Sequence, residues 1–170
     1  MAEVLNNINL ELHEASSKKA KGNNNSLPVE KTINGEFNLS GSPMFSAEVG
    51  SEFTKMKLGS DEPSSLGGRG VQPSPLTYVL FGVMACYGSS LAAECAEEGL
   101  ELKDIKIRGK LSYDLGPVVT DARAPIITGL RLEVISSSDL KAQIRKAWEK
   151  CPAVYAIQNP IPTEIQQVSK

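Results

Sequence analysis

Cysteine and histidine are scarce in this chain of 170 residues, which holds three cysteines and one histidine. No two cysteines form a CxxC pair. A zinc site is therefore not expected, because structural zinc needs clustered cysteine and histidine ligands. An odd number of cysteines without a framework spacing also argues against a disulfide-bonded secreted scaffold. In a reducing compartment such thiols are free, bound to metal or redox-active.

A strong charge of either sign is also lacking. Lysine and arginine total 18 against 20 acidic residues, so the net charge is -2. Such a balance favours neither a nucleic acid nor an anionic membrane as a partner. The N-terminus lacks a basic segment followed by an apolar one, so we expect a cytoplasmic protein. The length and the 41% hydrophobic content predict one globular domain over residues 1–170.

The most informative stretch is 73–99, which carries no charge between Gly70 and Ala93. It predicts a buried helix that begins at Ser74-Pro75 and ends at Gly99. Its unbroken apolar part, 76–87, is too short to cross about 30 Å of hydrocarbon. No membrane partner is expected.

Two faces of this helix differ in side-chain size. Large residues recur at helical spacing on one face, which predicts a core contact. Small residues recur on the other, where a second backbone could come close. The large ones are Leu80, Met84, Tyr87 and Leu91, and the small ones are Gly82, Cys86, Ser89 and Ala93.

Before this helix the sequence predicts strands and loops. Alternation over Val4–Leu12 is typical of a strand. The polar stretch 16–26 predicts a mobile loop, and Asn34-Gly35 predicts a hairpin turn. Strand-like pieces continue to about Leu58, and 60–72 predicts a loop that leads into the helix.

After the helix, alternation over 105–113 and 126–134 predicts two strands. A second helix follows, capped within Ser136–Ser138 and ended or kinked by Pro152. A short apolar turn and a last strand over 161–168 complete the pattern. The order of elements predicts an α+β fold with mostly antiparallel sheets. The apolar stripe of the second helix comprises Leu140, Ile144, Ala147, Trp148 and Cys151.

Cys86 and Cys151 lie on buried-looking helix faces, the second directly before a helix-breaking proline. Two thiols far apart in sequence, each beside a structural irregularity, suggest a redox pair. The alternative for each is ordinary packing, since buried cysteine often acts as a small hydrophobe. Cys95 lies near the opposite side of the helix from Cys86, which favours a structural or exposed thiol.

Short motifs follow one another in a fixed order within residues 47–168. They are Asp61-Glu62-Pro63, Gly67-Gly68, Pro73-Ser74-Pro75-Leu76, Ala85-Cys86, Glu98-Gly99-Leu100, Lys150-Cys151-Pro152-Ala153-Val154 and Asn159-Pro160. In their order, and in the spacing of the two cysteines, they resemble the OsmC/Ohr family of thiol-dependent hydroperoxide reductases. The resemblance implies an intertwined homodimer in which antiparallel sheets pack around long central helices.

The resemblance also implies a mechanism for a thiol-dependent peroxidase. Cys86 would attack an apolar organic hydroperoxide and become a sulfenic acid, and Cys151 would condense with it to a disulfide. An external dithiol would restore both thiols, so no cofactor and no metal are expected. Leu80, Phe81 and Met84 would line or back a pocket for the apolar substrate.

The chain departs from the family where Cys86 must be activated. The family's peroxidases use an arginine from the N-terminal strands, held by a glutamate in the first turn of the cysteine helix. Here that turn holds Leu76 and Thr77, and no arginine precedes Arg69. Arg69 and Thr77 are the candidate substrate-binding residues. The other candidate cations near Cys86 are Lys31, Lys55 and Lys57.

Two other functions remain open. The missing arginine–glutamate pair favours a dimer that binds a small apolar or acyl-like ligand without turnover. A redox sensor would form the same disulfide but would be oxidised stoichiometrically. Turnover of hydroperoxide by Cys86 separates the first hypothesis from both of these.

Overall fold

A computed structural model describes residues 3–168 of the chain. Within them the chain forms two compact units. Unit 1 comprises 3–11, 82–108 and 133–168, and unit 2 comprises 12–81 and 109–132. Because each unit collects separate stretches of sequence, the units are not consecutive domains. The expectation of one domain over 1–170 stays a prediction.

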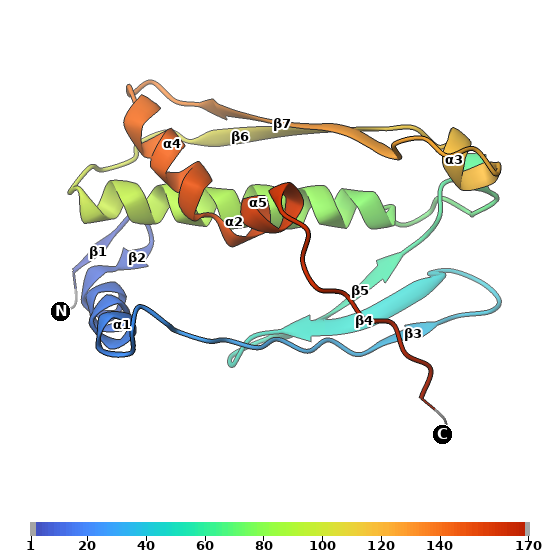
Figure 1. Cartoon of the computed structure of the whole chain (residues 1–170), viewed down its shortest axis with the longest axis horizontal. Helices are drawn as coiled ribbons and strands as arrows, with labels where there is room; N and C mark the ends of the chain where they lie inside the picture. Colours follow the sequence, from blue (N-terminus) through green and yellow to red (C-terminus); the bar gives the residue numbers. More distant parts are fainter. Residues whose placement is uncertain (1–2, 169–170) are drawn as a thin grey trace. The chain divides into compact units, whose positions relative to one another are not determined.

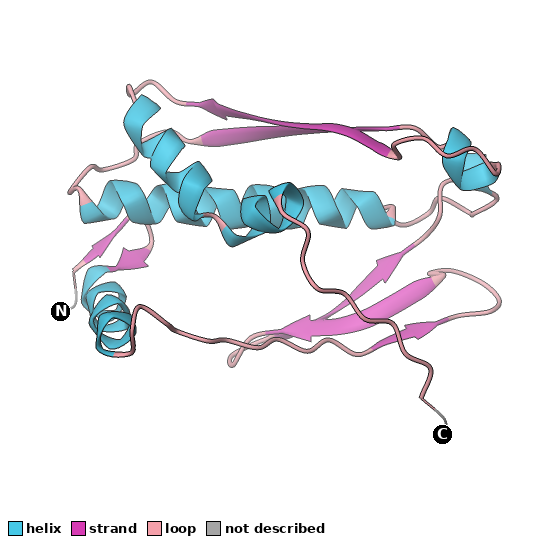
Figure 2. Ribbon diagram, in the orientation of Figure 1, coloured by secondary structure: helices cyan, strands magenta, loops and turns pink. Residues whose placement is uncertain are grey.

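Helices and antiparallel sheets together make an α+β fold, as the sequence predicts (Figures 1 and 2). The elements in chain order are β1 (Val4–Leu5), β2 (Ile8–Asn9), α1 (Leu10–Gly22), β3 (Gly35–Phe37), β4 (Phe45–Gly50), β5 (Lys55–Ser60), η1 (Ser64–Leu66), α2 (Pro75–Glu97), β6 (Lys106–Tyr113), α3 (Gly116–Val119), β7 (Ile127–Ile135), α4 (Lys141–Lys150) and α5 (Pro152–Gln158).

The long helix α2 confirms the strongest prediction from the sequence. It begins at Pro75, whose fixed φ suits the first helical position. It ends in a Schellman motif: Gly99 adopts a φ of 69°, and Leu100 N–H donates to the Cys95 carbonyl at 2.8 Å. A side chain at Gly99 would be strained, so glycine is required there.

The packed face of α2 is a stripe at helical spacing that includes Val83, Tyr87, Leu91 and Cys95. Tyr87 and Leu91 are buried, as predicted, while Leu80 and Met84 are half-buried. On the small-residue face, Gly82 and Ser89 are exposed and Cys86 and Ala93 are half-buried.

By length and composition alone, α2 could cross a membrane, with a mean hydropathy of 1.5 over an 18-residue window. The core helix of a soluble protein passes the same test, so this property is weak evidence for a span.

Serine hydroxyls in α2 donate within the helix itself: Ser89 bonds to the Ala85 carbonyl and Ser90 to the Cys86 carbonyl.

The core of unit 1 forms where α4 and α5 contribute buried apolar residues. Leu140, Ala147, Cys151 and Val154 are all buried there. Of the predicted stripe of the second helix, Leu140, Ala147 and Cys151 are buried, while Ile144 and Trp148 are half-buried. The start of this helix differs, because Leu140 is the residue at the N-cap and no side chain caps the helix. The predicted apolar turn after Pro152 is instead the helix α5.

The N-terminal prediction of a strand over 4–12 is wrong. Asn6 and Asn7 adopt positive φ and divide the segment into the antiparallel hairpin β1–β2. Asn6 bridges to the end of α2, because its amide donates to the Leu100 carbonyl and accepts from Leu102 N–H, both at 2.8 Å. Helix α1 then begins at Leu10.

The predicted loop over 16–26 is also wrong for most of its length, since α1 continues to Gly22. Lysine and alanine are good helix formers, and Lys18 pairs with Glu14 one turn earlier at 2.7 Å. At the other end of the chain, the predicted strand over 161–168 is absent, because those residues carry no regular structure.

Unit 2 contains the antiparallel sheet β3–β4–β5. Asn34-Gly35 is not its turn, because Gly35 opens β3 and pairs with Ala47. The buried carboxylate of Asp61 fastens the loop before β4: Ser42 Oγ and Met44 N–H each donate to it at 2.7 Å. The hydrogen bond from Ser42, followed by that from Met44, outweighs burial and lowers the pKa of Asp61.

Candidate active site

Cys86 lies in the middle of α2 and is half-buried. Cys86 is the residue before Tyr87, and Tyr87 belongs to the packed stripe of α2. The side chain of Cys86 therefore lies beside that stripe rather than at its centre. Being half-buried, it is more open to reagents than the other two cysteines. None of the three forms a disulfide in this structure.

Cys151 lies at the junction between α4 and α5 and is completely buried. Its backbone is extended, with φ of -74° and ψ of 117°. The sequence explains this junction: a proline in a helix interior loses a hydrogen bond and clashes with the preceding turn. Helix α4 therefore ends at Lys150, and Pro152 opens α5.

Tyr87, the residue after Cys86, links α2 to α4 and to the junction. Its hydroxyl donates to the Ile144 carbonyl of α4 at 3.1 Å. Its ring meets Trp148 edge-on, with centroids 6.1 Å apart. Burial, and secondly the sulfur of Cys151, raises the pKa of Tyr87. The structure thus brings Cys151 close to the residue that follows Cys86.

Cys95 is completely buried in the last turns of α2. Burial raises the pKa of its thiol, and the carboxylates of Glu98 and Glu94 raise it further. A buried thiol beside two acidic residues stays protonated and unreactive. Of the two alternatives for Cys95, burial excludes the exposed thiol and favours the structural one.

Arg69 and Thr77 belong to unit 2, whereas both cysteines of the expected pair belong to unit 1. Arg69 is exposed in the glycine-rich approach to α2. Thr77 is exposed in the first turn, where its hydroxyl lies 3.0 Å from that of Ser74. That turn contains no acidic residue. Of the candidate lysines, Lys55 pairs with Glu48 at 3.0 Å.

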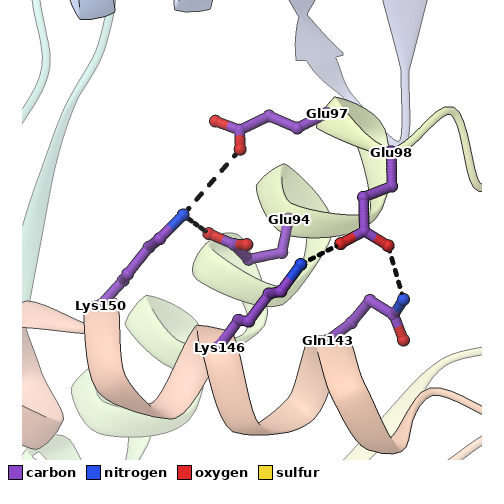
Figure 3. A network of polar contacts seen from close by, with 6 residues as sticks. All are labelled: Glu94, Glu97, Glu98, Gln143, Lys146 and Lys150. Carbon is purple, nitrogen blue, oxygen red and sulfur yellow. Dashed lines mark hydrogen bonds and ion pairs between the residues drawn. The ribbon is translucent and has the colours of Figure 1, made fainter.

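A set of charged residues that the sequence did not reveal joins α2 to α4 (Figure 3). Lys150 pairs with Glu94 and lies 3.9 Å from Glu97. Lys146 pairs with Glu98 at 2.5 Å. One signal was visible: Glu94 continues the stripe of Tyr87 and Leu91, so it places a charge on a buried face, which requires a partner.

An apolar cavity of about 470 Å³ lies within unit 2. It is lined by the sheet β3–β4–β5 and by Pro75 and Tyr78 at the start of α2. The expected pocket residues Leu80, Phe81 and Met84 do not line this cavity. Within residues 3–168, no group of three or more histidine, cysteine or acidic residues is arranged to hold a metal ion.

These features define a class of protein: an α+β chain whose long apolar helix carries a half-buried thiol and whose later helix junction carries a buried one. The model of the OsmC-like protein family matches residues 67–166. The chain belongs to that family. A comparison with curated proteins found no match.

Solved structures share the fold at low sequence identity. An OsmC-like protein from Mycoplasma pneumoniae is 19% identical, covering 79% of this chain and 91% of that chain, with a TM-score of 0.56. An organic hydroperoxide resistance protein from Legionella pneumophila is 21% identical, covering 77% and 92%, with a TM-score of 0.52. A candidate organic hydroperoxide resistance protein from Vibrio cholerae, with captopril bound in one of its active sites, is 15% identical, covering 79% and 89%, with a TM-score of 0.54.

Proposed function

We propose that this protein is a thiol-dependent peroxidase that reduces organic hydroperoxides with Cys86 and Cys151. The observation that carries the proposal is the difference in burial between the two cysteines. Cys86 is half-buried and open to a small substrate, whereas Cys151 is buried at a helix junction near Tyr87. This arrangement suits Cys86 to react first and Cys151 to react only with Cys86.

The chemistry proceeds in three balanced steps. The Cys86 thiolate attacks the O–O bond of a hydroperoxide; its sulfur is oxidised to sulfenic acid and the substrate leaves as an alcohol. The Cys151 thiol displaces water from that sulfenic acid and forms the Cys86–Cys151 disulfide. An external dithiol reduces this disulfide by two exchanges and is itself oxidised to a disulfide.

Membership of the OsmC-like family supports a role in peroxide detoxification. So does the fold shared with the organic hydroperoxide resistance protein from Legionella pneumophila. Reduced thiols and an external dithiol suit the cytoplasm, which we propose as the location.

We propose further that the active form is a homodimer. On α2, Val79 and Phe81 leave large apolar side chains exposed, and Phe81 is 68% exposed. Gly82 and Ser89 on the same helix are exposed and small. Extensive exposed apolar surface marks an interaction site, and small residues let two helices approach closely.

A second function, binding of a small apolar or acyl-like ligand without turnover, is favoured by one observation. The first turn of α2 contains no acidic residue to hold a cation for Cys86. The apolar cavity of unit 2 would suit such a ligand, since ligand sites are concave and mostly apolar.

The test is hydroperoxide consumption at neutral pH with a dithiol reductant. Cumene hydroperoxide and hydrogen peroxide are supplied to the wild type and to the variants Cys86→Ser, Cys151→Ser and Cys95→Ala. We expect multiple turnovers in the wild type and none in Cys86→Ser. Cys151→Ser should slow steady turnover by about 100-fold, because an intramolecular step is lost.

Cys95→Ala is the matched control and should retain wild-type turnover, since the buried Cys95 takes no part in the chemistry. Absence of turnover in a folded, reduced wild type would overturn the peroxidase proposal for these substrates. A small apolar molecule that co-purifies with such an inactive protein would then support ligand binding.

A further inference from the structure

Glu94 is a carboxylate on the packed face of α2, and its side chain is only 7% exposed. Burying an ionised carboxylate is costly unless a cation pairs with it. Its partner is Lys150, as Figure 3 shows. Glu94 therefore strongly favours positions of α4 in which Lys150 stays within reach.

Lys150 occupies a special place, because it is the last residue of α4 and directly precedes Cys151. Beyond it the backbone becomes extended at Cys151 before α5 begins. Cys151 is also the N-cap residue of α5, and its carbonyl accepts from Tyr155 N–H at 2.9 Å. The junction is thus held by α5 on one side, and on the α4 side the ion pair with Glu94 holds the residue directly before Cys151.

The other end of the ion pair is tied to the first thiol. Glu94 lies about two turns beyond Cys86 on the same helix, and a helix is rigid over that distance. The pair thus connects the rigid element bearing Cys86 to the junction bearing Cys151.

A second ion pair joins α4 to Glu98, the residue directly after α2; its carboxylate is more exposed, and its lysine is farther from Cys151 in the sequence. Lys146 pairs with Glu98 at 2.5 Å, and Gln143 also donates to Glu98 at 2.7 Å. The side chain of Glu98 is 34% exposed, so water compensates for a lost partner. Lys146 lies one turn before Lys150, away from the junction. This pair fastens the helices without holding Cys151.

We infer that the Glu94–Lys150 ion pair positions Cys151 for disulfide formation with oxidised Cys86. The inference rests on the proposed function and assigns positioning residues to its second step. Neither residue takes part in the attack on hydroperoxide. Loss of the pair should slow condensation and leave the oxidation of Cys86 unchanged.

The experiment follows a single turnover in the full chain. Reduced protein is mixed with one equivalent of cumene hydroperoxide and quenched at intervals with a sulfenic-acid trap and a thiol alkylating agent. Mass spectrometry then reports Cys86 thiol, sulfenic acid and disulfide separately. The variants are Glu94→Gln, with Lys150→Arg to retain the positive charge, and the matched control Glu98→Gln.

In Glu94→Gln we expect Cys86 to be oxidised at the wild-type rate, while disulfide forms about tenfold more slowly and sulfenic acid accumulates. Lys150→Arg and Glu98→Gln should match the wild type in both steps. A merely structural role would affect both steps, or would affect Glu94→Gln and Glu98→Gln alike.

Wild-type condensation in Glu94→Gln, or an equal slowing in Glu98→Gln, would overturn the inference. If Glu94→Gln does not fold, the double variant Glu94→Gln/Lys150→Met removes both charges and leaves no unpaired buried ion. Rapid disulfide formation in that variant would also overturn the inference. A wild type whose oxidised Cys86 never pairs with Cys151 would instead contradict the proposed function itself.

Discussion

Three thiols of identical chemistry lie in three different surroundings along this chain. Cys86 is half-buried in the middle of a helix, and Cys151 is buried where two helices meet. Cys95 is buried beside two carboxylates. Reactivity of a cysteine depends on its thiolate fraction and its access to reagents, so these surroundings assign different roles.

The raised pKa of Cys95 predicts a pH dependence of stability. A group with a higher pKa in the folded state binds its proton more tightly when the protein is folded. Its contribution is therefore complete below the unfolded pKa of about 8.5 and declines as the pH rises further, towards the folded pKa. Between about pH 8 and pH 10, the free energy of unfolding should fall less steeply in Cys95→Ala than in the wild type.

Urea unfolding across this pH range measures both slopes. Alkylation at neutral pH gives an independent check, because Cys95 should react only after denaturation while Cys86 reacts in the folded protein. Equal slopes, together with rapid labelling of native Cys95, would contradict the assignment of a buried structural thiol.

At the scale of elements, buried polar contacts hold segments that have little regular structure of their own. Asp61 in unit 2 is the clearest case, because its two oxygens accept from Ser42 and from Met44 N–H. Both donors lie in the loop that leads into β4. The carboxylate therefore determines how this loop reaches the sheet.

Asp61→Asn should destabilise unit 2 near neutral pH. The hydrogen bonds lower the pKa of Asp61, so its stabilising contribution is present above the unfolded pKa of about 3.9. The contribution is lost as the pH falls through the folded pKa. The variant should have a lower urea midpoint at pH 7 and a flatter dependence on pH in the acid range.

The control for this variant is Asp121→Asn, at a position that is exposed in the same unit. It should retain the wild-type midpoint at pH 7. An unchanged urea midpoint in Asp61→Asn at pH 7 would contradict the prediction. The asparagine amide would then serve Ser42 and Met44 as well as the carboxylate does.

Elements with strong local signals were predicted well. A proline at the first position and a glycine past the end bracket α2, and both residues act through their own backbone. Alternation likewise identified β6 and β7. The strand predicted over 4–12 failed because Ile8, Leu10 and Leu12 fit a period of two, while Asn6-Asn7 turns the chain and α1 begins at Leu10.

At the scale of the whole molecule, α2 presents small exposed residues that nothing in the described chain explains. A Cβ atom built on Gly82 would meet no atom of residues 3–168 within 4 Å. Glycine also costs about 1 kcal/mol against alanine in a helix interior. Close approach by a second copy of the chain would account for it.

Gly82→Leu should therefore raise the dissociation constant of the proposed homodimer by about tenfold or more while the fold is retained. Sedimentation velocity over a range of concentrations measures the constant, and far-UV circular dichroism checks the helices. Gly22→Leu is the matched control, since a Cβ there also meets nothing within 4 Å. A Gly82→Leu dimer as tight as the wild type would exclude this helix face from the interface.

The sequence by itself determined the α+β class, the bounds of α2, the break at Pro152 and the two cysteines that resemble those of the family. Each depends on backbone preferences or on spacing along the chain. Only the tertiary structure decided that Cys95 and Cys151 are buried while Cys86 is half-buried, and that Glu94 pairs with Lys150. The reason is physical: burial and ion pairing depend on contacts between segments far apart in sequence, which local patterns do not encode.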